Sequence, residues 1–213
     1  MDSRSSMSKV TVVRHPLADH SLTMLRHKQT DTEAFRKHAG IVSKILILEA
    51  TKHLSLTKTR ITTPIAPTAG KKLKENVVVV PVLRAGLAML FALQDFLPAV
   101  SVGFIGLERD EQTAQAHEYY RKMPKLYASH LVMVIDPMLA TGGSFDNTIT
   151  MLKEKGAKRI TIVSIVSAPQ GIEKIRSRHP GVHIFTGAID DGLNAKKYIV
   201  PGLGDFGDRY FGT

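Results

Sequence analysis

The sequence predicts an α/β protein with a parallel sheet flanked by helices. Two stretches rich in β-branched residues, 77–83 and 131–135, have the unbroken apolar character of strands that are buried on both faces, and 159–166 is a further β-branched stretch. Stretches with the apolar spacing of helices, 87–97 and 145–155, follow the first two of them. Strands that alternate with helices in this way are typical of a doubly wound sheet, whose ligands bind beyond the carboxyl ends of the strands. Polar residues directly after a strand are therefore the first candidates for a functional site.

Length and composition limit the classes of protein to which the chain can belong. Its 213 residues fit a single domain spanning 1–213, with residues 1–9 as a polar, serine-rich loose tail. The absence of cysteine excludes disulfides, thiol nucleophiles and cysteine–zinc sites. No apolar run approaches 18 residues and no signal-peptide pattern is present, so we expect a cytoplasmic protein without a membrane partner.

The charge of the chain points to an anionic partner. The formal net charge is +10, which suits either a polyphosphate or nucleic acid. The basic residues are scattered along the sequence and only 6% of residues are aromatic, so base-stacking platforms are not expected. We therefore expect no nucleic acid as the main partner, although charge alone permits it.

The first quarter of the chain predicts an extended segment and a long helix. Residues 10–17 read as an extended segment that Pro16 ends. Thr30 and Glu33 have the spacing of a capping box, with Thr30 as the N-cap of a helix that runs to about His53. The apolar face of this helix is so wide that we expect it to pack against a second subunit as well as its own domain.

The next part contains a strand that leads into a basic turn. A strand or hairpin is expected near residues 60–66, and the buried strand 77–83 then runs directly into Arg84-Ala85-Gly86 and the apolar helix 87–97. An arginine at this point offers paired donors that match phosphate oxygens. The alternative is a solvated arginine on a strand-to-helix turn.

A polar insertion follows the third strand, which we place at residues 101–107. Residues 108–125 are charged and lack a helical stripe. Such an insertion between two buried strands is either a surface excursion or a mobile lid over a site from which water is excluded.

The stretch 130–144 carries the strongest functional signal. The buried strand 131–135 stops at Asp136-Pro137, and Thr141-Gly142-Gly143-Ser144 then opens the helix 145–155. Glycines let a ligand approach the backbone, and the free amides of the first helical turn bind phosphate. A carboxylate repels phosphate but accepts hydrogen bonds from sugar hydroxyls. A sugar phosphate satisfies both halves of the motif, whereas the alternative is that Asp136 merely caps a turn.

The C-terminal third adds two strands and a glycine-rich tail. A strand at 159–166, a helix at 169–178 and a strand at 182–186 continue the α/β alternation. In the tail, Gly202, Gly204 and Gly207 match a formal dinucleotide fingerprint, which we reject because it opens no helix and has only six residues after it. Dense glycines instead let backbone groups meet the edge of a small planar ligand. The alternative is a terminal loop that packs on the core.

Three of these motifs resemble those of one enzyme family. Residues 135–144 resemble the phosphoribosyl-pyrophosphate (PRPP) loop of uracil phosphoribosyltransferases, including Asp-Pro where most phosphoribosyltransferases have two adjacent acids. Residues 82–87 resemble the pyrophosphate loop of the family, and residues 198–205 its uracil-binding segment. The resemblance extends from His15 to the terminal Thr213. It implies the type I phosphoribosyltransferase fold, with a flexible hood at 108–125 and a C-terminal base-binding segment.

The resemblance also implies an activity and a set of site residues. The activity is transfer of the phosphoribosyl group of PRPP to uracil, which gives UMP and pyrophosphate. The PRPP-binding positions are Arg84, Arg109, Asp136, Pro137, Met138, Leu139, Ala140, Thr141, Gly142, Gly143, Ser144 and Asp205, and the uracil-binding positions are Ile199, Gly204, Asp205 and Phe206. The catalytic residues are Asp205, Arg84 and Asp136, with a strained peptide at Leu83-Arg84. Asp205 either orients Mg²⁺-bound water or favours loss of the uracil N1 proton.

Further expectations concern the cofactor and the partners. Mg²⁺ is expected to bind mainly through PRPP and water, without a protein metal site. We expect a homodimer or larger homo-oligomer, and GTP activates some relatives. Phe206 departs from the family, in which we expect a small residue, so the sequence leaves the tightness of the base pocket open. The alternatives are a regulator with the same fold that binds nucleic acid and transfer to another base.

Overall fold

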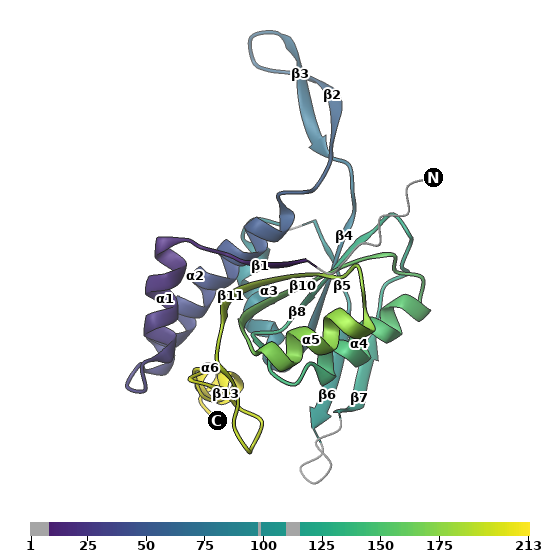
Figure 1. Cartoon of the computed structure of the whole chain (residues 1–213). Helices are drawn as coiled ribbons and strands as arrows, with labels where there is room; N and C mark the ends of the chain where they lie inside the picture. Colours follow the sequence, from purple (N-terminus) through teal and green to yellow (C-terminus); the bar gives the residue numbers. More distant parts are fainter. Residues whose placement is uncertain (1–8, 98, 110–115) are drawn as a thin grey trace.

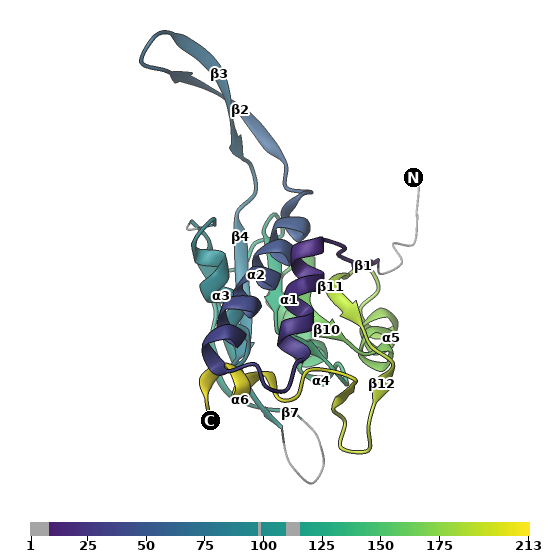
Figure 2. The same cartoon turned by 90° about the vertical axis from the view of Figure 1, so that its left-hand side faces the viewer.

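The computed structural model describes residues 9–97, 99–109 and 116–213, and its elements form three layers around a central sheet (Figure 1). The main strands are β1 (Val10–Val12), β4 (Val77–Leu83), β6 (Phe104–Arg109), β7 (Ala116–Lys122), β8 (Leu131–Ile135), β10 (Arg159–Ser167) and β11 (His183–Ile189), with the short β5 (Ser101–Val102) and β9 (Met138–Leu139) beside β4 and β10. Their order is β1-β11-β10-β8-β4-β6-β7. Helices α1 (Pro16–Arg26), α2 (Thr32–Thr51) and α3 (Gly86–Gln94) cover one face, and α4 (Gly143–Glu154) and α5 (Pro169–Arg178) cover the other (Figure 2). None of the helices in the described ranges is long and apolar enough to cross a membrane.

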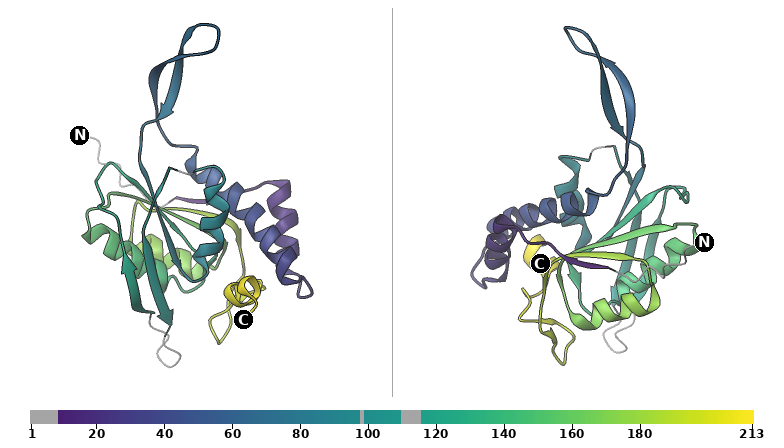
Figure 3. Two further views of the ribbon diagram at one scale, coloured as in Figure 1. Left: turned by 180° about the vertical axis from the view of Figure 1, so that it is seen from behind. Right: turned by 45° about the horizontal axis from the view of Figure 1, so that its top comes forward.

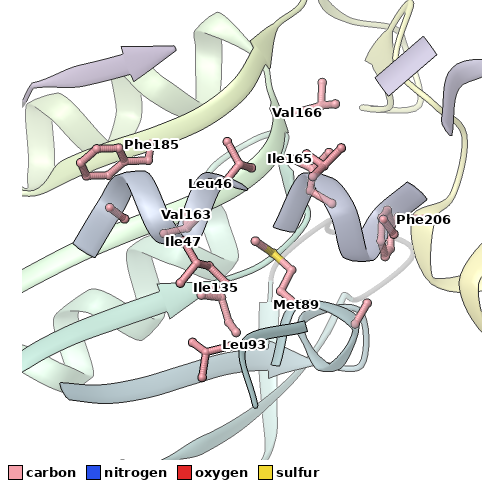
Figure 4. Close-up of a cluster of buried hydrophobic side chains, with 14 of the residues drawn as sticks. Leu46, Ile47, Met89, Leu93, Ile135, Val163, Ile165, Val166, Phe185 and Phe206 are labelled. Atoms are coloured by element: carbon pink, nitrogen blue, oxygen red, sulfur yellow. The ribbon is translucent and has the colours of Figure 1, made fainter. Parts of the chain in front are cut away.

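The predicted parallel sheet flanked by helices is confirmed. All neighbouring strands of this sheet that the structure describes are parallel except β6 and β7, which form an antiparallel pair. The unbroken apolar runs are explained by burial on both faces. Within β4, Val77 and Val79 belong to the cluster under α2 and α3, while Val78 and Val80 belong to the cluster under α4 and α5. Figure 4 shows part of the first cluster.

The N-terminal prediction was wrong about Pro16. Strand β1 ends at Val12, and Pro16 begins α1 instead of ending an extended segment. Proline is favoured in the first turn of a helix because the N–H that it lacks would have no helical partner there. The helix buries Ala18, Leu22 and Leu25, which share one face at spacings of four and three residues.

The predicted long helix is confirmed, with a different cap. The N-cap of α2 is Asp31, whose carboxylate accepts a hydrogen bond from the Ala34 N–H at 2.8 Å. Thr30 instead donates its hydroxyl to the Met24 carbonyl at 2.6 Å, which ties it to the end of α1. Threonine and aspartate are both good N-caps, and the bond of Thr30 to the Met24 carbonyl leaves the N-cap position of α2 to Asp31.

The predicted hairpin lies a few residues away from its expected position. Strands β2 (Leu56–Thr62) and β3 (Pro67–Leu73) pair antiparallel, and the turn between them is closed by the Thr63 N–H donating to the Ala66 carbonyl at 3.0 Å. The hairpin projects away from the body of the protein in every view (Figures 1 and 3). Ile65 at its tip is 95% exposed.

The insertion and the tail both contain regular structure. Much of the 108–125 segment is the hairpin of β6 and β7, whose residues 110–115 lie outside the described residues, as does most of the expected loose tail 1–9. The C-terminal part contains the two-residue strands β12 (Gly192–Leu193) and β13 (Ile199–Val200) and the short helix α6 (Phe206–Phe211). The expectation that Gly202 to Gly207 opens no helix was therefore wrong. The glycines follow a strand of a separate antiparallel pair, so a dinucleotide-binding βαβ unit is still absent from this described segment.

Candidate functional site

Two strand-to-helix turns meet at the carboxyl edge of the sheet. Strands β4 and β8 are paired neighbours, with Pro81 opposite Ile135. The turns that follow them are packed together, because a Cβ atom built on Gly86 would lie only 2.7 Å from the Ile135 carbonyl oxygen. The peptide between Leu83 and Arg84 is cis. The structure therefore places the Arg84 turn and the Asp136 turn side by side, as expected for residues that share one site.

The loop after β8 is fixed in place through its backbone. The Pro137 carbonyl accepts hydrogen bonds from the Ile165 and Val166 N–H groups at 2.9 and 3.0 Å, and the Leu139 carbonyl accepts one from the Ala168 N–H at 2.8 Å. These bonds attach the loop to β10 and to the start of α5. The loop is thus a rigid part of the sheet edge.

The loop ends in a helix N-terminus that has the geometry of an anion site. Gly142 is the N-cap of α4, with φ = 77° and no side-chain cap. The Gly143 N–H donates to the Thr141 hydroxyl at 3.4 Å, which is a long and weak bond. The amides of the first turn therefore keep hydrogen-bonding capacity for a ligand, and the helix dipole favours an anionic one.

Asp136 stands at the end of β8 in an unusual electrostatic environment. Burial raises the pKa of its carboxyl from 3.8 to about 7, opposed by one hydrogen bond that its Oδ1 accepts from the Met138 N–H at 3.3 Å. A desolvated carboxylate is short of hydrogen-bond donors. Asp136 is therefore suited to accept hydrogen bonds from the hydroxyl groups of a ligand.

The raised pKa predicts that Asp136 destabilises the ligand-free protein as the pH rises. Between the unfolded value of 3.8 and the folded value of about 7, the folded chain binds a proton that the unfolded chain releases. The free energy of unfolding that Asp136 contributes through this proton is therefore fully present below about pH 4 and is lost as the pH rises through about 7. The stability of wild type relative to Asp136→Asn should fall by about 2–3 kcal/mol from pH 5 to pH 8. Urea unfolding of both proteins at the two pH values measures this, and a constant difference would contradict it.

The C-terminal segment lies against the Arg84 turn. An Asp208 carboxylate oxygen is 3.9 Å from Arg84 Nη2, and both side chains are largely exposed. Asp205 is the N-cap of α6, and its Oδ1 accepts a hydrogen bond from the Asp208 N–H at 3.0 Å. The structure thus brings Asp205 to within one helical turn of a residue that contacts Arg84.

The three other predicted base-reading positions, Ile199, Gly204 and Phe206, lie on the same C-terminal segment. Gly204 has φ = 81°, and Ile199 is buried in the core. Phe206, which Figure 4 labels, is also buried. Its ring packs against Phe35 with ring centroids 5.2 Å apart. The bulk of Phe206 therefore lies in the core below α2, which explains how the chain carries a large residue there.

The predicted PRPP contact of Arg109 and the binding of Mg²⁺ are the remaining predictions. Arg109 is the last residue of β6, and its side chain lies outside the described part of the structure. Within the described ranges no group of three or more histidine, aspartate or glutamate side chains converges as a metal site would require. The carboxylates of Asp136, Asp205 and Asp208 are nonetheless hard oxygen donors of the kind that Mg²⁺ accepts, directly or through water.

The prediction from sequence missed two residues next to the site. Arg26 at the end of α1 and Asp190 after β11 form a bidentate ion pair that also contacts Gly202. An acid directly after a strand was a signal for Asp190. Arg26 was missed because α1 itself was not predicted.

Comparisons with known proteins agree over nearly the whole chain. The family model described as "Uracil phosphoribosyltransferase" matches residues 12–213. Curated proteins with that name from Campylobacter fetus and Clostridium perfringens are 45% and 47% identical over 97% of this chain, which covers 99% and 100% of their lengths.

Solved structures agree on the fold. The AQ2163 protein from Aquifex aeolicus superimposes with a TM-score of 0.90 and 35% identity, over 95% of this chain and 97% of that one. A hypoxanthine-guanine phosphoribosyltransferase from Bacillus anthracis, 13% identical, superimposes with a TM-score of 0.51 over 75% of this chain and 80% of its own. The second of these matches bears on the fold alone.

Proposed function

From the premise that the chain belongs to the uracil phosphoribosyltransferase family, we propose how its residues transfer the phosphoribosyl group of PRPP to uracil, giving UMP and pyrophosphate. The activity itself follows from the family, which confirms the prediction made from the three motifs. The observation that supports the site assignment best is the contact between the turns after β4 and β8. Asp208 of the C-terminal segment contacts Arg84 in the first of these turns.

The loop 136–144 holds the ribose phosphate in this proposal. The amides and hydroxyls from Ala140 to Ser144 bind the 5′-phosphate at the start of α4, where the helix dipole adds about 0.3–1 kcal/mol. The carboxylate of Asp136 accepts hydrogen bonds from the ribose hydroxyls. Pro137, Met138 and Leu139 fix the loop to β10, so the phosphate site and the sugar site keep one relative position.

Arg84 and Arg109 hold the pyrophosphate. The Arg84 side chain is 63% exposed, and its one ion pair with another described residue is the long contact to Asp208, so its donors are available to phosphate oxygens. Cations at this place stabilise the negative charge that develops as pyrophosphate leaves and the ribose carbon becomes cation-like. Mg²⁺, when bound, would neutralise part of that charge, held mainly by PRPP oxygens and water near Asp136 and Asp205.

Uracil is read by the backbone of Ile199 and of Gly204 to Phe206. Burial of Phe206 in the core leaves its amide at the start of α6, beside Asp205. Backbone groups discriminate bases well, because the wrong edge leaves a buried donor or acceptor unpaired. Asp205 either orients water on the metal or favours loss of the uracil N1 proton.

A parallel assay of bases tests the proposal. Product formation from PRPP should occur with uracil and not with cytosine or hypoxanthine, and EDTA should abolish it. Turnover of a purine would contradict the uracil assignment, and full activity in EDTA would contradict the role of the metal. Filter binding with RNA across a salt series examines the alternative of a nucleic-acid regulator.

We also propose that the chain forms a homo-oligomer through α2 and the β2–β3 hairpin. A second copy would cover five apolar side chains that are between 43% and 95% exposed: Leu48 on α2, and Leu56, Ile61, Ile65 and Leu73 on the hairpin. A groove of about 460 Å³, lined in part by Lys58, Arg60 and Pro67, lies on the hairpin. Light scattering should give a lower mass for Ile65→Asp than for wild type, and equal masses would contradict the proposal. We further propose a GTP effector, which the resemblance suggests, and a cytoplasmic location. Activation assays test the first and cell fractionation tests the second.

A further inference from the structure

An ion pair between Arg26 and Asp190 connects three distant parts of the chain. Arg26 is the last residue of α1, and Asp190 follows β11. The guanidinium donates to both carboxylate oxygens, at 2.8 Å from Nη1 and 2.6 Å from Nη2. The Asp190 side chain is only 4% exposed, so the pair is largely shielded from water. The planar guanidinium matches the two carboxylate oxygens and so fixes the geometry of the pair.

The same ion pair binds both backbone polar groups of Gly202. The Gly202 N–H donates to Asp190 Oδ2 at 2.8 Å, and the Gly202 carbonyl accepts from Arg26 Nη1 at 2.8 Å. Gly202 has φ = 59°, and a Cβ atom built there would lie 2.2 Å from the Ile199 carbonyl oxygen. The position therefore requires glycine.

Gly202 lies between the residues proposed to read uracil. Ile199 precedes it by three positions and Gly204 follows it by two. A second arginine supports the same region, because Arg209 donates to the Leu203 carbonyl at 2.7 Å and to the His27 carbonyl at 2.8 Å. The end of α1 is thus joined to the base-reading segment from two sides.

Other described backbone bonds to this segment are few. Strand β13 pairs with β12 over two residue pairs, and the Asp191 N–H donates to the Val200 carbonyl at 3.0 Å. These bonds connect the segment to residues 191–193, which leave β11 at Asp190. Together with the Arg209 bonds, the ion pair relates that local unit to α1 and hence to the body of the protein.

We propose that Arg26 and Asp190 are positioning residues that hold the backbone of residues 199–204 in the register needed to bind uracil. This inference rests on the proposed uracil-binding role of that segment. The pair acts through Gly202 and does not contact the base. Its loss should weaken uracil binding while leaving the PRPP loop, which is attached to β10, undisturbed.

Steady-state kinetics with each substrate varied in turn test the inference. Arg26→Lys keeps the charge but loses the fork, so it should raise KM for uracil by at least about tenfold, the effect of one lost charge-assisted hydrogen bond. KM for PRPP should change less than about twofold. Asp190→Asn should show the same selective rise, since its amide cannot accept all three hydrogen bonds. Equal rises in both KM values, or no rise in KM for uracil, would overturn the inference.

Two controls separate positioning from general destabilisation. Arg36 donates from Nε to the Tyr210 carbonyl at 2.8 Å and so also ties a helix to the C-terminal segment, but it does not contact Gly202. Arg36→Lys should leave both KM values unchanged, and a selective rise in KM for uracil there would overturn the inference. Thermal melting of each variant identifies any that is unfolded at the assay temperature. If Arg26→Lys is unfolded, the KM values of Asp190→Asn decide instead. If wild type itself fails to use uracil, the proposed function fails; if only the selective rise is absent, the inference about the clamp fails.

Discussion

Asp136→Asn should lower kcat/KM for PRPP by about 10²–10³-fold. The carboxylate is proposed to accept hydrogen bonds from two ribose hydroxyls, and each charge-assisted bond contributes about 1.5–3 kcal/mol. Asparagine has the same shape but only one acceptor oxygen, and it brings N–H donors to a place where hydroxyl donors are expected. Initial rates with PRPP varied at saturating uracil measure the effect.

The stability of this variant provides a sharp control. Because burial raises the pKa of Asp136 to about 7, the neutral asparagine should unfold less readily than wild type at pH 8. A large loss of activity in a protein that is at least as stable cannot be caused by unfolding. Asp95→Asn, which changes an exposed carboxylate at the far end of α3 from Arg84, should keep full activity. An Asp136→Asn enzyme within about threefold of wild type would refute the assignment of Asp136 to the ribose.

Gly171→Ala should raise KM for PRPP by about 10- to 100-fold without changing any side chain that faces the substrate. A Cβ atom at Gly171 in α5 would lie 2.5 Å from the Ala140 carbonyl oxygen and 2.9 Å from that of Leu139. Both carbonyls belong to the loop proposed to bind PRPP, so that loop has to move. A displacement near 1 Å costs an enzyme up to about 10²-fold in rate. The overpacking should also cost about 1–3 kcal/mol of stability.

Gly40→Ala is the matched control for this substitution. A Cβ atom on Gly40, in the middle of α2, would meet nothing within 4 Å. Alanine there should raise stability by roughly 0.5–1 kcal/mol, because glycine loses more backbone entropy on folding, and should leave the kinetics unchanged. Unchanged KM for PRPP in Gly171→Ala would show that α5 does not set the position of the loop.

The elements that could be predicted are those whose local pattern leaves one outcome. The boundaries of β4, β8 and α5 agree with the prediction. Strands β4 and β8 are buried apolar runs that stop where a charged residue follows, and α5 begins at a proline, which is favoured in the first turn of a helix. The cap of α2 was misplaced because Thr30 and Asp31 are equally good caps in isolation, and the contact of Thr30 with Met24 is tertiary. The helix α6 was missed because six residues with two glycines nearby have little helical propensity of their own.

The motifs of the site could be recognised in the sequence, whereas the long-range contacts that hold them in place could not. Arg84 and Asp136 stand directly after buried strands, where any parallel sheet brings polar residues together. The pair of Arg26 and Asp190 joins residues 164 positions apart, and no local pattern records such a contact. Likewise, nothing in the sequence around Phe206 indicates that its ring is buried against Phe35.

The β2–β3 hairpin, which projects from the body of the protein (Figure 3), is inserted between the end of α2 and the start of β4. Arg84 and Asp136 instead follow the carboxyl ends of β4 and β8. The length and charge of the hairpin can therefore change without moving the residues at the carboxyl edge. Relatives with the same residues at the carboxyl edge can thus differ in the hairpin, and with it in the proposed association of their copies.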